Sequence, residues 1–530
     1  MKRALALLAA LTLGFGIATH QGDAASAASY EPITGTGSTW SENAIKQWQR
    51  NVQSYGMQVN YSGVGSSAGR RDFIADTVDF AVSEIPFQAK PEDGSAAEKP
   101  GRGYAYMPIV AGGTAFMYNL KIGGKRVTNL RLSGDTITKI FTGGITKWDD
   151  PQIKKDNPKL AMPDKAIVPV VRSDGSGSTA QFTLWMSKQH SALWNSFCKS
   201  VGRSSPCGLT SQYPGFGNAK LQNGSSGVAG YVSQDTGEGA ITYVEYSYAL
   251  KSGFPVAKVL NNAGYYVEPT QYAVAVALMQ ARINENPSSP DYLTQILDGV
   301  YNAKDARAYP LSSYSYLIVN TTAPTKVFTT AKGKTLGAFG KYLLCEGQQQ
   351  AGALGYSPLP MNLVQAGFKQ IKRIPGAGGV TADLNKCNNP TFKPGDSPKK
   401  NQLAQIAPMP AACDKAGSDQ CGTSTGGTGN GNSNGGTGGT GGTGTDSGGD
   451  TGGTGGTGTD GSGTGDGTGS GTGTGSGTGG AVAASTPFKL ADSGWGGSQL
   501  LMVAAGLLLL SAMVIPPLLG QRNRAREESK

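Results

Sequence analysis

Residues 170–182 read VVRSDGSGSTAQF, and this stretch does most to decide the fold. A strand-like apolar run enters it, serines and glycines form a loop, and residues with helical spacing follow. Two stretches repeat this arrangement, GTGSTW at 35–40 and GVGSSAGRR at 63–71. Each loop places backbone N–H groups and hydroxyls at a helix N-terminus, where unpaired donors and a partial positive charge favour anions. Three such loops predict a site that surrounds one small oxyanion.

Strand-like and helix-like segments alternate around these loops. We expect strands at 57–63, 78–84, 106–119, 166–173 and 316–320, and a strand that leads into a helix at 239–250. Helical spacing predicts helices at 70–77, 132–144, 179–194 and 334–356. This alternation predicts an α/β fold with mostly parallel sheets. Ligands in such sheets bind beyond the carboxyl ends of the strands, which is where the three loops lie.

The two ends of the chain have the patterns of targeting and anchoring segments. Residues 1–27 combine basic residues, an apolar run and small residues, which predicts a secretory signal peptide. Residues 422–485 are rich in Gly and Thr and predict a disordered tether. The apolar segment 499–520 is long enough to cross a bilayer, and its alternative is a buried core helix. The basic tail at 521–530 then places the C-terminus in the cytoplasm, which predicts a single-pass cell-membrane protein.

The remaining residues, 28–421, are expected to fold outside the cell. They are more than a single core usually holds, so we expect two lobes. The first lobe is predicted at about 30–110 and 280–375, and the second at about 115–275. The role of the segment from 376 to 421 stays open.

The six cysteines all lie in this exported part, and their even number favours disulfides in an oxidising compartment. Six cysteines allow 15 pairings. Nearness in sequence favours Cys198 with Cys207 and Cys413 with Cys421, which leaves Cys345 with Cys387. A metal site is the alternative, but the chain has no CxxC and only two His.

The net charge of the 530-residue chain is +10, which is compatible with nucleic acid, an acidic wall polymer or an anionic ligand. The exported part has no dense Lys/Arg run with interleaved aromatic residues, so the sequence argues against nucleic acid. We expect no cofactor and no metal ion.

The three loops supply neutral donors and one fixed cation. The guanidinium of Arg172 can hold two oxygens of a tetrahedral anion at once. Neutral donors at the three loops add hydroxyl and backbone N–H groups, and they are Thr39, Trp40, Ser66, Ser67, Ser176, Gly177 and Ser178. For a single loop, ordinary helix caps and glycine turns would be the simpler interpretation. The presence of three loops favours the anion site.

Glu84 ends a predicted strand and is expected to point into the same cleft. A carboxylate in an anion site is reasonable when the anion carries a proton that the carboxylate can accept. Hydrogen phosphate has such a proton, whereas sulfate at neutral pH does not, so Glu84 would exclude sulfate. The alternative is a solvated surface Glu.

Five motifs resemble, in order, those of the phosphate-binding proteins of bacterial phosphate ABC importers. Besides the first and third loops, they are NYSGVGSSAGRRDFIADTVDFAVSEIPF, ITKIFTGGITKWDDPQI and GSSGVAGYVSQDTGEGAITYVEYSYAL. The resemblance covers roughly residues 30–375. It implies a two-lobed periplasmic-binding-protein fold of type II, each lobe a mostly parallel sheet flanked by helices, with phosphate between the lobes. We then expect a monomer whose partners are inorganic phosphate and the membrane permease subunits.

The resemblance also implies roles for single residues. Thr39 and Trp40 match the first pair of contacts, Ser66 the second loop, and Arg172, Ser176, Gly177 and Ser178 the third. Asp174 matches the carboxylate that orients the Arg, and Ser67 is expected beside the site. The family usually has Phe at Trp40, Thr at Ser178 and Asp at Glu84. The Glu needs more room than an Asp, and the tether and membrane segment also depart from the family.

Three functions are compatible with these features. The first is capture of phosphate and its delivery to a permease, without catalysis. The second is a surface-anchored oxyanion sensor or adhesin with the same fold. The third is a serine hydrolase or phosphatase, since residues 65–69 fit G-x-S-x-G. A serine nucleophile needs a base, and His190 is the only His beyond the signal peptide, so the sequence argues against an enzyme.

Overall fold

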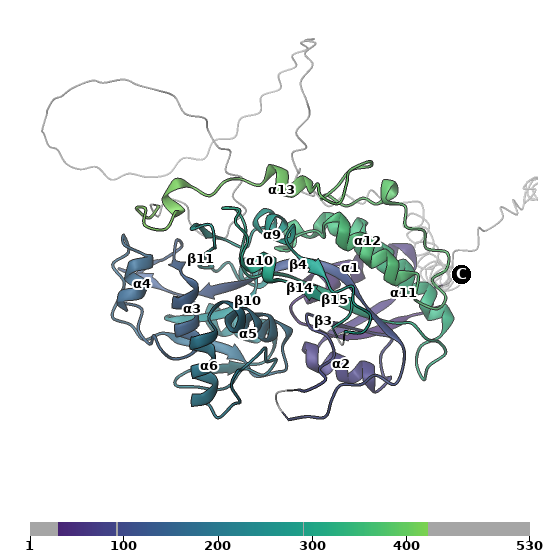
Figure 1. Cartoon of the computed structure of the whole chain (residues 1–530), viewed down its shortest axis with the longest axis horizontal. Coiled ribbons are helices and arrows are strands. Elements are labelled where there is room, and N and C mark those ends of the chain that lie inside the picture. The colour runs from purple at the N-terminus through teal and green to yellow at the C-terminus, as the bar shows by residue number, and fades with distance from the viewer. Residues whose placement is uncertain (1–29, 92–93, 290, 422–530) are drawn as a thin grey trace, which may run out of the picture. The chain divides into compact units, whose positions relative to one another are not determined.

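An eight-stranded sheet runs through the part of the chain that the computed structural model describes, residues 30–91, 94–289 and 291–421 (Figure 1). Its strand order is β2-β1-β3-β15-β4-β10-β8-β9. The strands are β1 (Ile33–Gly37), β2 (Val59–Gly63), β3 (Phe80–Ser83), β4 (Tyr104–Tyr118), β8 (Val168–Arg172), β9 (Lys220–Gln222), β10 (Ala240–Glu245) and β15 (Ser312–Asn320). The predicted signal peptide (1–27), tether (422–485), membrane segment (499–520) and basic tail (521–530) lie outside the described residues.

Each end of the sheet is parallel, whereas its centre is antiparallel. Strands β2, β1 and β3 pair in parallel at one end, and β10, β8 and β9 do so at the other. The central strands β15 and β4 run antiparallel to their neighbours. The 15 residues of β4 pair with β15 over one part and with β10 over another, so they join the two ends. The predicted parallel sheets are therefore present, but shared central strands link them into one mixed sheet.

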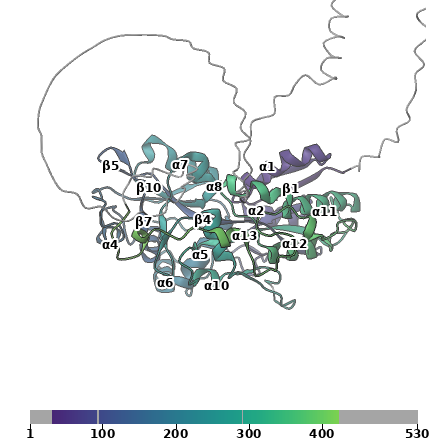
Figure 2. The same ribbon diagram turned by 90° about the horizontal axis from the view of Figure 1, so that it is seen from above.

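The helices flank the two ends of this sheet (Figures 1 and 2). They are α1 (Glu42–Val52), α2 (Ser66–Ile74), α3 (Gly134–Phe141), α4 (Pro151–Asp156), α5 (Gly177–Gln189), α6 (Ser191–Ser200), α7 (Gly224–Ser233), α8 (Tyr246–Ser252), α9 (Gln271–Leu278), α10 (Asp298–Tyr301), α11 (Thr330–Leu344), α12 (Met361–Ile371) and α13 (Gln402–Ile406). We call the part with β1–β3, α1, α2, α11 and α12 the first lobe. The part with β8–β10 and α3–α7 is the second lobe.

Small sheets complete the architecture. Strands β7 (Arg131–Leu132), β11 (Lys258–Leu260) and β12 (Tyr266–Val267) form a three-stranded sheet. Two hairpins are formed by β5 (Lys121–Ile122) with β6 (Lys125–Arg126), and by β13 (Arg282–Ile283) with β14 (Gln295–Ile296).

Local sequence explains several helix boundaries. In α1 the buried residues Ala44, Ile45, Trp48 and Val52 share one face, as helical spacing requires. The side chain of Ser133 caps α3 by accepting the N–H of Thr136. Two predicted helices end early: the segment 179–194 breaks at His190 into α5 and α6, and α11 stops at Leu344 before short 3-10 turns. Tertiary packing sets these breaks, which helical spacing alone does not reveal.

The segment 376–421, which we call the strap, lies along the top of Figure 1. Its disulfide to the first lobe joins Cys387 to Cys345, and Cys413 pairs with Cys421 near its end. The third disulfide joins Cys198 to Cys207, so the favoured pairing is confirmed. Within residues 30–91, 94–289 and 291–421, no helix combines the length and apolar character needed to cross a membrane.

Candidate functional site

The three serine-glycine loops meet between the lobes. Strands β1, β2 and β8 each end in one of the loops, and α1, α2 and α5 follow. The N–H of Gly177, the first residue of α5, donates to Ser66 Oγ at 3.2 Å. The N–H of Ser67 donates to the carbonyl of Gly175 at 3.1 Å. The N-termini of α2 and α5 therefore converge, as the strand–loop–helix pattern predicts.

Glu84 lies at the centre of this junction and is 1% exposed. Its Oε1 accepts hydrogen bonds from Ser38 at 2.5 Å and from Ser315, and its Oε2 accepts one from Ser66 at 2.7 Å. A Cβ atom on Gly177 would lie 1.8 Å from Glu84 Oε2, so only glycine allows α5 to approach the carboxylate. Glu84 is thus a buried carboxylate held by three hydroxyls, and not a solvated surface residue.

Arg172 is held in a fixed orientation by Asp174. Its Nε donates to Asp174 Oδ1 at 2.7 Å, and its Nη2 pairs with Oδ2 of the same carboxylate. Burial alone would raise the pKa of Asp174, but the hydrogen bonds and charge of Arg172 outweigh it, so this pKa lies below its usual value. This bidentate pair leaves Nη1 of Arg172 to donate elsewhere, and it contacts Ser225 Oγ at 3.4 Å.

Thr39 and Trp40 occupy the loop after β1. Thr39 Oγ1 lies 2.9 Å from Ser225 Oγ and accepts the N–H of Ser225 at 3.2 Å. The N–H of Trp40 donates to Ser38 Oγ at 3.0 Å, and its buried ring packs edge-on against Tyr356. The loop therefore faces both Glu84, through Ser38, and Arg172, through Ser225.

The remaining predicted residues have different roles. Ser176 caps α5 by accepting the N–H of Thr179, which is the simple interpretation weighed above. Ser178 Oγ is buried and has no hydrogen-bond partner among the described residues, so it is a donor in need of an acceptor. Ser67 lies beside the junction, where its hydroxyl contacts Arg70 and Ser211. Whether these residues contact an anion stays a prediction.

Three serines that touch the junction were not among the predicted contacts, namely Ser38, Ser225 and Ser315. Ser38 lies in the motif 35–40 and Ser225 in the motif 224–250. Both motifs are singled out in the sequence, so they could have pointed to these two serines. Ser315 lies within β15, 231 residues from Glu84, and no local pattern marks it.

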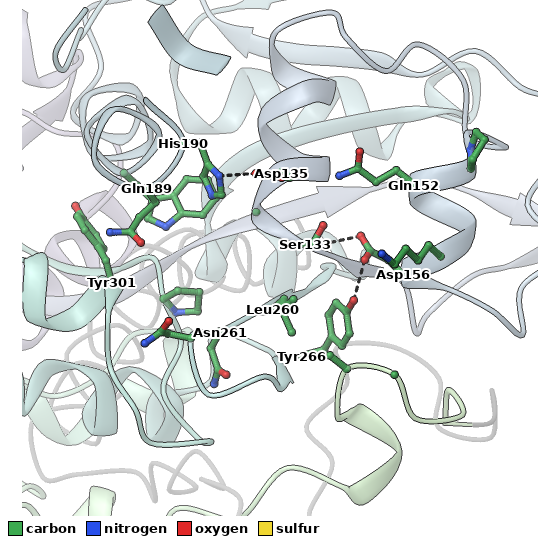
Figure 3. A pocket seen from close by; sticks show the side chains of 18 residues that line it. Ser133, Asp135, Gln152, Asp156, Gln189, His190, Leu260, Asn261, Tyr266 and Tyr301 are labelled. Carbon is green, nitrogen blue, oxygen red and sulfur yellow. Dashed lines mark hydrogen bonds and ion pairs between the residues drawn. The ribbon is translucent and has the colours of Figure 1, made fainter. Parts of the chain in front are cut away.

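His190 does not serve the junction. Its Nδ1 lies 2.8 Å from Asp135 Oδ1, and its ring packs edge-on against Trp185. His190 and Asp135, both labelled in Figure 3, line a separate cavity between the second lobe, α10 and the strap. Its volume is about 870 Å³, and none of the predicted site residues lines it. Burial shifts the pKa of His190 below its usual value, and this effect outweighs the opposite effect of the Asp135 carboxylate. Ser66 and Ser67, the serines of the G-x-S-x-G match at 65–69, therefore form hydrogen bonds with other groups and not with His190.

Known relatives decide the family of this chain. A family model for a PBP superfamily domain matches residues 22–346. The chain is 34% identical over 334 residues to the phosphate-binding protein PstS of Xylella fastidiosa (strain Temecula1), which covers 63% of this chain and 83% of that protein. The chain belongs to the PstS family. A PstS from Pasteurella multocida is 32% identical over 367 residues, covering 69% of this chain and 94% of the relative.

Solved structures include a phosphate binding protein from Stenotrophomonas maltophilia, which is 16% identical to the chain with a TM-score of 0.48. That similarity covers 64% of this chain and 93% of the other. Membership of the PstS family confirms the predicted resemblance and the two-lobed α/β fold. It also agrees with the expectation that the chain is not an enzyme, because the PstS relatives are named as binding proteins.

Proposed function

We propose that this PstS-family chain captures inorganic phosphate between its lobes and delivers it to the permease of an ABC importer. The observation that carries the proposal is the junction itself, where an oriented Arg172, two helix N-termini and buried hydroxyls converge around Glu84. Such donors can replace the water around a tetrahedral anion without a metal ion. The names of the PstS relatives support phosphate as this anion.

Glu84 would give the site its selectivity. A carboxylate repels an anion unless the anion offers it a proton, so hydrogen phosphate is accepted and sulfate is not. The hydroxyls of Ser38, Ser66 and Ser315 donate to this carboxylate and hold it in place. Its extra methylene, compared with the Asp usual in the family, is accommodated by the absence of a side chain at Gly177.

Calorimetric titration of the full-length chain in detergent tests the proposal. We expect saturable binding of phosphate and none of sulfate at equal concentrations. The substitution Glu84→Gln should improve sulfate binding relative to phosphate by about 10- to 100-fold, because an amide N–H replaces the repulsive carboxylate oxygen. The exposed Glu346→Gln is a matched control, since Glu346 contacts only Asn388 among the described side chains. A wild-type chain that does not bind phosphate would contradict the proposed function.

We also propose that the chain acts as a monomer tethered to the cell membrane, with the binding lobes outside the cell. The basis is the sequence alone: the signal pattern at 1–27, the Gly/Thr-rich 422–485, the apolar 499–520 and the basic 521–530. Deletion of 499–520 should move the protein from the membrane fraction of cells to the medium. Unchanged association with the membrane after this deletion would contradict the anchor.

A further inference from the structure

Ser225 connects two candidate anion contacts that come from opposite lobes. It lies in the first turn of α7 and is fully buried. Its hydroxyl oxygen is 2.9 Å from Thr39 Oγ1 of the first lobe and 3.4 Å from Nη1 of Arg172 in the second. Its backbone N–H also donates to Thr39 Oγ1, at 3.2 Å.

Two of the hydrogen-bond directions follow from the chemistry of these groups. A guanidinium only donates, so Ser225 Oγ accepts from Arg172. Thr39 Oγ1 accepts the Ser225 N–H, and in the hydrogen bond between the two hydroxyls either oxygen can donate. The hydroxyl of Ser225 therefore links Thr39 of one lobe to Arg172 of the other.

Helix α7 takes its N-terminal hydrogen-bond partners from both lobes. The side chain of Asn223, its N-cap residue, makes no capping hydrogen bond. Instead, Asp174 Oδ1 accepts the N–H of Gly224 at 2.9 Å, and Thr39 accepts that of Ser225. Opening of the cleft would carry Thr39 away and leave the N–H and hydroxyl of Ser225 without this partner, which costs free energy at a helix N-terminus.

We propose that Ser225 is a positioning residue that links Thr39 to Arg172 and latches the closed cleft, so that it sets the rate of phosphate release. The inference rests on the proposed function and extends it to the control of release. Ser225 acts through Thr39 and Arg172, and it need not touch phosphate itself.

Release kinetics of the full-length chain test this role. Labelled inorganic phosphate is chased with unlabelled phosphate, and association is followed by rapid mixing. In Ser225→Ala the release rate should rise about 10- to 100-fold, while the association rate changes little, because the lost hydroxyl hydrogen bond to Thr39 joins the lobes only in the closed state. Ser225→Thr, which keeps the hydroxyl, should restore slow release.

Controls separate this role from simple loss of structure. Ser233→Ala changes a serine at the other end of α7, whose hydroxyl contacts only the carbonyl of Gly230, and should leave release unchanged. The effects of Thr39→Val and Ser225→Ala should be less than additive in the double variant, because both substitutions remove the hydrogen bond between the two hydroxyls. If the wild-type chain binds phosphate but Ser225→Ala releases it at the normal rate, or if the Thr variant also releases it quickly, the inference is wrong. Absence of phosphate binding by the wild type would instead overturn the proposed function.

Discussion

The lobes are joined by different means at the junction and along the strap. At the junction, α5 and α2 meet through single hydrogen bonds between small groups, such as Gly177 N–H to Ser66 Oγ. The strap is fixed to the first lobe by the Cys345–Cys387 disulfide and to the second by contacts of Arg131 and Lys258. Figure 1 shows the strap at the top and α2 near the bottom. The junction is thus held by hydrogen bonds between small groups, whereas the strap adds a covalent bond.

The largest expected effect comes from removing the cation of the junction. Arg172→Ala should weaken phosphate binding by about 30- to 5000-fold, because it removes the guanidinium of the junction and leaves the buried Asp174 without its ion-pair partner. Calorimetric titration of the full-length chain measures this loss. Arg126→Ala, at an exposed arginine over the ring of Phe254, is the control and should bind phosphate normally. Retained affinity in the Arg172 variant would contradict the assignment of the junction as the anion site.

A smaller effect, on stability, should come from releasing the strap. Replacement of Cys345 and Cys387 by serine opens a loop with a sequence separation of 42 residues, and the unfolded chain then gains entropy worth about 4 kcal/mol. Replacement of Cys198 and Cys207, separated by 9 residues, should cost about 2.5 kcal/mol. Urea unfolding of the two double variants compares them directly. Equal decreases in the free energy of unfolding would show that the strap disulfide stabilises the protein no more than the disulfide of the short loop 198–207.

Much of the junction could be predicted from sequence because its geometry follows from chain order. Parallel strands place their carboxyl ends at one edge, so the loops 35–40 and 63–71 after β1 and β2 lie near each other. Strand β8 runs in the opposite direction to β1, so the loop 170–182 meets them from the facing lobe. The pairing of Arg172 with Asp174 is also local, since the two residues lie two positions apart in sequence. Glu84 could be placed because a strand ends there.

The other contacts depend on packing between distant segments. Ser315 reaches Glu84 because β15 pairs antiparallel with β3 and places Tyr316 opposite Ser83, and a serine in a strand carries no sign of its partner. The sequence around Ser225 is that of an ordinary helix start. Its hydrogen bond to Thr39, 186 residues earlier, could therefore not be predicted from the sequence. The strap has no helical or strand periodicity, and its course is set by a disulfide and scattered side-chain contacts.

The place where the strap ends has a mechanical consequence. The carbonyl of Cys421 accepts a hydrogen bond from Asn129 of the second lobe at 3.0 Å, next to the Cys413–Cys421 loop. Tension along the chain beyond residue 421 would therefore load this loop and its bonds to Arg131 and Lys258 first. The second lobe would carry this force, and the force would not separate the N-termini of α2 and α5.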